Sequence, residues 1–161
     1  MAGITIYETA IAPEWIDYNG HLRDAYYGLI VSFACDALMD RLGLDAAYRA
    51  RSHCTLYTLE MHLHYLKEVK GGDRVSVAVT ILGADHKRLH AGFDLRPAGA
   101  ATAAATAEMM LLHVRQGENV TTTPFPAPVQ DAITALAAAS PAAAFGPVSR
   151  ALSLRGGARS G

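Results

Sequence analysis

The sequence has few cysteines and no excess of positive charge, and each absence excludes a class of protein. The two cysteines, Cys35 and Cys54, lie in apolar stretches and form no Cys-x-x-Cys or paired Cys/His spacing. We therefore expect buried free thiols, and neither a metal knuckle nor a disulfide framework. Lys and Arg number 14 against 15 Asp and Glu, a net charge of -1, so the positive field typical of nucleic-acid-binding proteins is missing.

Long uncharged hydrophobic runs are also missing. No stretch of about 18 such residues occurs, and residues 1–10 do not have the basic start and apolar run of a signal peptide. We expect a cytoplasmic protein with neither a membrane nor a nucleic acid as a partner. A chain of 161 residues fits one domain, since about 150 residues bury roughly 68–70% of their extended surface.

A first strand is predicted at residues 5–11 and a long helix at about residues 23–42. Apolar side chains cover most of this helix, and Ser32, Asp36 and Asp40 recur every four residues as one narrow polar stripe. Such a helix must be surrounded on most sides. Gly43 is a suitable residue to end the helix at its C-terminus.

Alternating strands follow a polar connection at residues 49–52. In residues 57–65, Tyr57, Leu59, Met61, Leu63 and Tyr65 are expected on one face, and Thr58, Glu60, His62 and His64 on the other. Further strands are predicted at residues 75–81 and 89–95, and turns at residues 70–73 and 83–86. Residues 100–115 are ambiguous, because alanines favour a helix there while Thr102, Thr106 and residues 111–114 favour a strand.

This order predicts an α+β fold in which an antiparallel sheet curls around a long central helix. We expect the domain to span residues 1–125. A short helix is expected at residues 126–140, behind Pro124 and Pro126, and a flexible tail at residues 141–161, which are rich in Ala, Gly, Ser and Arg.

Three polar residues precede the predicted helix at two-residue spacing: Asp17, Asn19 and His21. A helix that begins near Leu22 would point unpaired N–H groups at the same place, where negative charge is stabilised. The segment thus offers a base and an anion hole together. Taken alone, Asp-x-Asn-Gly is also typical of a tight turn with helix capping.

The chain resembles the hotdog-fold acyl-CoA thioesterases of the 4-hydroxybenzoyl-CoA thioesterase superfamily over residues 5–125. The resemblance is carried by residues 17–21, by residues 60–67 (Glu-Met-His-Leu-His-Tyr-Leu-Lys) and by residues 85–90 (Asp-His-Lys-Arg-Leu-His). The Asp-x-Asn-x-His spacing also resembles plant acyl carrier protein thioesterases, in which all three positions take part in catalysis. The resemblance therefore implies that Asp17, Asn19 and His21 are catalytic in a thioester hydrolase that needs no cofactor or metal.

The full pattern, with Trp15 ahead and residues 24–27 behind, is most similar to the betainyl-CoA thioesterases of carnitine breakdown. Some of these are fused to L-carnitine dehydrogenases, whose glycine-rich dinucleotide fingerprint is absent here. The family usually has asparagine where Arg23 stands. Betainyl-CoA is the expected substrate; a non-catalytic acyl-CoA sensor and a hotdog dehydratase are the alternatives.

Aromatic side chains suit a trimethylammonium group, through cation–π contacts, and basic ones suit the phosphates of coenzyme A. The expected acyl-binding residues are Trp15, Tyr18, Tyr26, Tyr27, Tyr57 and Tyr65. The expected CoA-binding residues are Lys67, Lys87 and Arg88, with Lys70 as a further cation. The resemblance also implies a homo-oligomer, a dimer or tetramer with sites at its interfaces.

Two other groups of residues compete for the role of the site. Asp36 and Asp40 are alternative carboxylates, because some hotdog thioesterases take theirs from the helix. Glu60, His62 and His64 share a strand face at a spacing that suits a divalent metal, but the sequence indicates no fourth ligand, so we expect no metal.

Overall fold

The computed structural model describes residues 3–146. The elements in chain order are β1 (Ile4–Ala10), η1 (Pro13–Trp15), α1 (Asp24–Arg41), α2 (Ala46–Ser52), β2 (Cys54–Tyr65), β3 (Arg74–Ala84), β4 (Arg88–Pro97), β5 (Ala105–Arg115), β6 (Thr121–Thr122), α3 (Ala127–Ala139) and η2 (Ala142–Ala144). Within the described range, none of the helices combines the length and the apolar character needed to cross a bilayer.

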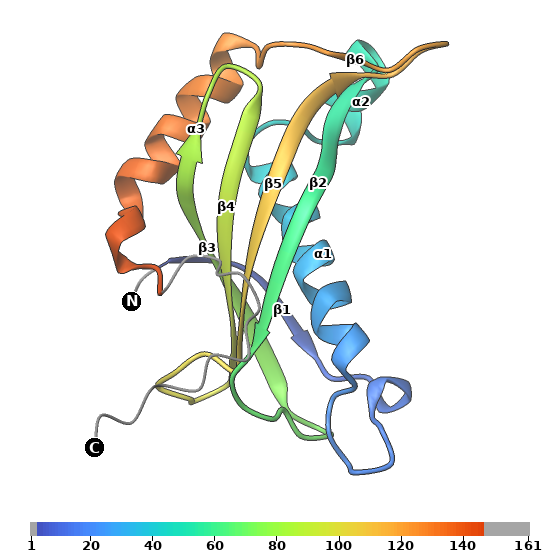
Figure 1. The fold of residues 1–161 in the computed structure, drawn as a ribbon, viewed down its shortest axis with the longest axis vertical. Coiled ribbons are helices and arrows are strands. Elements are labelled where there is room, and N and C mark those ends of the chain that lie inside the picture. Colours follow the sequence, from blue (N-terminus) through green and yellow to red (C-terminus); the bar gives the residue numbers. More distant parts are fainter. Residues whose placement is uncertain (1–2, 147–161) are drawn as a thin grey trace, which may run out of the picture.

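The six strands form one antiparallel sheet in the order β1-β3-β4-β5-β2, with β6 paired to β5. The sheet curves along α1, as Figure 1 shows, and α3 lies on the other side, where it packs on β3. The predicted antiparallel sheet curled around a long helix is confirmed. Strand β2 pairs with β5 rather than with its neighbour in sequence, β3, so β1 and β2 are the two edge strands.

The core lies between α1 and the inner face of the sheet. The strands contribute the alternate residues Val75, Val77, Val79 and Ile81 of β3, Leu89, Ala91, Phe93 and Leu95 of β4, and Ala105, Ala107, Met109 and Leu111 of β5. Helix α1 buries Ile30, Val31, Ala34, Cys35, Leu38 and Met39 against them. Ser32, Asp36 and Asp40 are exposed, as the polar stripe predicts, and both cysteines are buried and free.

A bulge in β2 changes which side chains share a face. The register shifts between Thr58 and Glu60, so Tyr57 lies opposite Leu112 while Met61 lies opposite Met109. Because Leu112 and Met109 are an odd number of residues apart, they point to opposite faces of β5. Tyr57 therefore lies on the outer face, and the prediction that residues 57–65 alternate without interruption is wrong.

The structure also resolves two connections. The polar segment before β2 contains helix α2, whose first turn is capped by the side chain of Asp45, which accepts a hydrogen bond of 2.8 Å from the N–H of Tyr48. Within the ambiguous residues 100–115, strand β5 occupies Ala105–Arg115 between β4 and β2.

The C-terminal part of the described chain covers the outer face of β3 and β4. Ser140 Oγ lies 3.1 Å from Thr80 Oγ1 on β3, and Phe145, after η2, is buried against Gly92 on β4. Of the tail predicted from residue 141, residues 147–161 lie outside the described residues. The division into a domain, a short helix and a tail stays a prediction.

Candidate active site

The loop before α1 is a tight reversal that holds Asp17, Asn19 and His21 together. Ile16 and Leu22 form an antiparallel bridge, and the N–H of Asp17 donates to the carbonyl oxygen of His21 at 2.8 Å. Gly20 has a φ of +80°, a conformation that favours glycine because it has no Cβ. The predicted turn is therefore present.

The carboxylate of Asp17 uses one oxygen to hold this turn. Its Oδ1 accepts hydrogen bonds from the N–H of Asn19, at 2.8 Å, and of His21, at 3.3 Å. For Oδ2 the structure records no hydrogen bond within residues 3–146, so this oxygen is available to a substrate or a water. Asp17 can therefore stabilise the turn through Oδ1 and still use Oδ2 in a reaction.

The Asp17 carboxyl has a pKa below its ordinary value. Partial desolvation raises the pKa, but the backbone N–H groups of Asn19 and His21 and the electrostatic effect of the nearby His21 and Arg23 side chains lower it by more. The group is therefore ionised at neutral pH, which both base catalysis and nucleophilic attack require.

Helix α1 begins two residues later than the predicted Leu22. Arg23 is the N-cap and makes no side-chain capping bond, so Asp17 does not cap the helix. In the first turn, the N–H of Ala25 is bonded to Asp24 Oδ1 at 2.8 Å and that of Tyr26 to the Arg23 carbonyl at 3.0 Å. Within the described residues, the N–H of Asp24 has no recorded acceptor and is the donor left for an oxyanion.

Glu68 lines the candidate site and was not predicted from the sequence. Its Oε2 lies 3.2 Å from Nε2 of His21, where it orients the imidazole. The bridge between His21 and Lys70 brings the segment after β2 to the loop. This contact joins residues far apart in the sequence, and the only local signal was the acidic residue next to Lys67.

A cavity of about 420 Å³ opens at this place. Its lining residues are Asp17, Asn19, His21 and Leu22 from the loop, Asp24 and Tyr27 from α1, and Tyr65, Leu66, Lys67 and Glu68 from the end of β2 and the segment after it. The structure therefore brings the three predicted catalytic residues together with two of the predicted tyrosines and one predicted cation.

The other predicted aromatic residues do not line this cavity. Trp15 and Tyr26 stack on each other with ring centroids 5.7 Å apart, and Tyr18 is 92% exposed. Tyr57 lies eight residues before Tyr65 on β2, which is about 26 Å along a strand. Within one chain these four side chains therefore do not gather around the cavity to enclose a trimethylammonium group.

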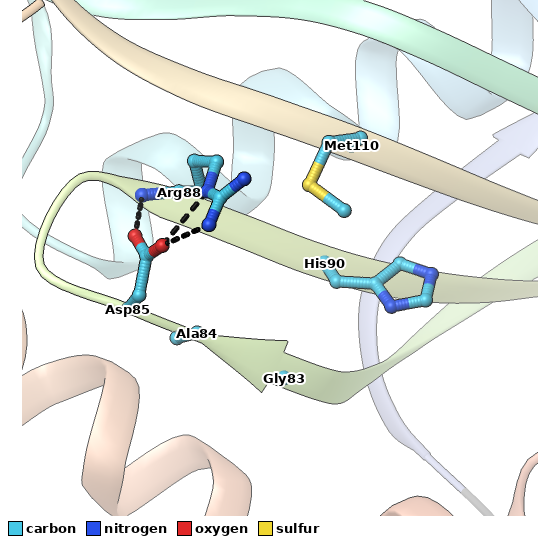
Figure 2. A pocket seen from close by; sticks show the side chains of 6 residues that line it. All are labelled: Gly83, Ala84, Asp85, Arg88, His90 and Met110. Atoms are coloured by element: carbon cyan, nitrogen blue, oxygen red, sulfur yellow. Dashed lines mark hydrogen bonds and ion pairs between the residues drawn. The ribbon is translucent and has the colours of Figure 1, made fainter.

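The predicted cations are divided between the two ends of the sheet. Lys67 lines the cavity, where its Nζ is 2.9 Å from Thr102 Oγ1. Lys87 and Arg88 belong to the β3–β4 hairpin, about 35 Å along β3 from the loop. There Arg88 pairs with Asp85 at 2.7 Å beside a second cavity, of about 310 Å³, on the outer face (Figure 2).

Neither competing group lines the cavity beside Asp17, although Glu60 and His62 line a separate, smaller pocket of about 150 Å³ with His90 and Glu108. Asp36 lies about 18 Å along α1 from Asp24, and Asp36 and Asp40 are both exposed. Glu60 and His62 are bonded to each other on the outer face. Among residues 3–146, no three or more His, Cys, Asp or Glu are arranged to hold a metal ion.

Comparisons with known proteins identify the family of this chain. A model of the thioesterase-like superfamily matches residues 11–133. A betainyl-CoA thioesterase of Pseudomonas aeruginosa is 54% identical over 111 residues, which are 69% of this chain and 70% of that protein. An L-carnitine dehydrogenase/betainyl-CoA thioesterase of Agrobacterium fabrum is 41% identical over 73% of this chain, but the match spans only 24% of that longer protein.

Solved structures share the fold. A candidate thioesterase of Pseudomonas putida superposes with a TM-score of 0.83 at 42% identity, covering 97% of this chain and 99% of the other. A Staphylococcus aureus protein in complex with CoA gives a TM-score of 0.79 at 30% identity, over 88% and 89% of the two chains. The sheet curled around its helix is thus the hotdog fold, and the chain belongs to the thioesterase-like superfamily and is a thioester hydrolase.

Proposed function

We propose that this protein hydrolyses betainyl-CoA to betaine and CoA, with Asp17, Asn19 and His21 as its catalytic residues. One observation carries the proposal: the three residues meet in a cavity at the start of α1, in a chain 54% identical to a protein named betainyl-CoA thioesterase. The S. aureus neighbour that holds CoA supports an acyl-CoA substrate in particular.

We propose the following roles for these groups in the reaction. The ionised Asp17 carboxylate removes a proton from water as the water attacks the thioester carbon, or attacks that carbon itself to form an anhydride that water then opens. Asn19 orients the attacking water. The N–H of Asp24 stabilises the oxyanion at the positive end of α1, and the C–S bond then breaks. His21, held by Glu68, protonates the departing CoA thiolate.

We also propose that two copies of the chain pair through β2. This edge strand exposes a row of apolar side chains, including Leu59 at 56% and Met61 at 43%. A long apolar edge of this kind invites pairing with another strand. A two-fold axis would make the two β2 strands antiparallel and bring the Tyr65 end of each copy alongside the Cys54 end of the other. Tyr57 would remain on the outer face of the joined sheet, so this pairing gives it no place in the acyl-binding site.

Coenzyme A binding is assigned to Lys67 within the same chain. Lys87 and Arg88 lie too far along the sheet for the same bound molecule, so they reach it only from another copy of the chain. The two free buried cysteines fit the reducing conditions of the cytoplasm, where we place the reaction.

The test measures thiol release from betainyl-CoA by the wild type and by Asp17→Asn. Replacing the carboxylate is expected to lower kcat by about 10²–10⁴-fold, the range for a positioned general base. Glu14→Gln, an exposed residue of η1, serves as the control and should retain wild-type activity. Equal rates in the wild type and Asp17→Asn would contradict the assignment. Binding of acyl-CoA without any thiol release would favour a sensor, and hydration of enoyl-CoA would favour a dehydratase.

A further inference from the structure

Tyr65 presents its ring to the catalytic cavity in a fixed orientation. The ring meets Tyr27 edge-on, with centroids 5.3 Å apart and planes at 87°. The Tyr65 hydroxyl donates a hydrogen bond of 3.1 Å to the carbonyl oxygen of Asp24, the first residue of α1. Tyr27 is itself anchored, because its hydroxyl accepts a hydrogen bond of 3.2 Å from the N–H of Val69. Tyr27 is buried whereas Tyr65 is 54% exposed, so Tyr65 supplies the accessible ring surface.

The charges around this ring are mostly negative. Three acidic residues, Asp17, Asp24 and Glu68, line the cavity, against one lysine, Lys67, and one histidine, His21. His21 is paired with Glu68, and the Lys67 ammonium is bonded to Thr102. Asp24 is the carboxylate that acts on Tyr65: burial and then the Asp24 charge raise the pKa of the Tyr65 hydroxyl, which stays neutral.

We propose that the face of the Tyr65 ring and the carboxylate of Asp24 form a subsite that selects acyl groups carrying a quaternary ammonium. The inference rests on the proposed function and names the residues that determine its specificity. A trimethylammonium group cannot donate hydrogen bonds, so it is recognised by aromatic faces and by negative charge. In betainyl-CoA the cation lies one methylene from the thioester carbon. A subsite at the first residue of α1 therefore adjoins the N–H assigned to the oxyanion.

A neutral substrate of the same shape shows how much the positive charge of the acyl group contributes to its recognition. In 3,3-dimethylbutanoyl-CoA, a carbon atom replaces the quaternary nitrogen and the three methyl groups remain. The readout is the ratio of kcat/KM for betainyl-CoA to kcat/KM for this isostere. Differences in thioester reactivity are the same in every variant, so they cancel when the variants' ratios are compared.

Four variants test the subsite. Asp24→Asn keeps the oxygen that bonds the N–H of Ala25 and removes the charge, and Tyr65→Leu removes the ring. Each is expected to lower the ratio by about tenfold, which corresponds to about 1.4 kcal/mol. Tyr65→Phe keeps the aromatic face and loses only the hydroxyl's bond to Asp24, so its ratio should fall less than that of Tyr65→Leu. Asp131→Asn removes the same charge from the exposed surface of α3 and should keep the wild-type ratio.

The outcomes separate the subsite from the proposed function. A ratio unchanged in both Asp24→Asn and Tyr65→Leu, with betainyl-CoA hydrolysed, would overturn the subsite and leave the proposed function standing. If the wild type hydrolyses neither thioester, the proposed function fails, and the subsite is tested by titrating the protein with tetramethylammonium chloride under NMR observation. The subsite then requires shifts at Tyr65 and a dissociation constant about tenfold higher in Asp24→Asn; equal binding by the two proteins would refute it.

Discussion

At the scale of single residues, the predictable part of the site is the part that is local in sequence. Asp17, Asn19 and His21 lie within one turn, whose hydrogen bonds and positive-φ glycine follow from the residues themselves. Glu68 could not be assigned in this way, because its contact with His21 depends on where the end of β2 meets the loop. The isolated bridge between His21 and Lys70, a contact that local patterns do not encode, brings Glu68 and His21 side by side.

Replacing Glu68 by glutamine tests whether it acts through His21. The Glu68 side chain is 72% exposed and that of His21 is half-buried, and ion pairs at the surface are worth about 0–1 kcal/mol. We therefore expect Glu68→Gln to lower kcat about fivefold and to leave the unfolding midpoint unchanged. In a His21→Ala background the same change should have no further effect, as a double-mutant cycle would show. Additive losses in kcat would instead mean that Glu68 acts independently of His21.

At the scale of elements, periodicity predicted α1, β3 and β4, because each buries a regular set of side chains. Alanine-rich β5 was ambiguous because its strand form depends on hydrogen bonds to β4 and β2 on either side, and such pairing overrides helix propensity. The bulge near Leu59 also has no local signature in the sequence, and it alone moves Tyr57 to the outer face.

Gly92 of β4 sets how closely the segment after α3 can approach the sheet. A Cβ at this position would lie 2.7 Å from Cε2 and Cζ of Phe145. Gly92→Ala is therefore expected to lower the free energy of unfolding by about 1–3 kcal/mol, the usual cost of overpacking. Urea unfolding measures the change. In a Phe145→Ala background the loss from Gly92→Ala should largely disappear, so strict additivity of the two changes would contradict a direct contact between these residues.

At the scale of the whole molecule, the sheet ends in two unlike edges. Strand β1 is seven residues long, whereas β2 has twelve residues and carries exposed Leu59, Met61 and Tyr65. The cavity with Asp17 opens at the Tyr65 end of the second edge. A partner bound along β2 would therefore cover the apolar row and close the site, so assembly and activity should depend on the same surface.

A lysine at Leu59 tests this dependence, because a charge on an edge strand opposes strand pairing. We expect light scattering after size-exclusion chromatography to give the wild type the mass of two chains or more and Leu59→Lys the mass of one. Activity should fall about 100-fold in the variant, because even a displacement of about 1 Å in a site costs that much.

Ala135→Lys is the control: it adds the same charge to the exposed surface of α3, far from β2, and should leave mass and activity unchanged. A Leu59→Lys protein that keeps both the mass and the activity of the wild type would show that β2 is not the interface, whereas one that is monomeric and fully active would show that a single chain holds the complete site.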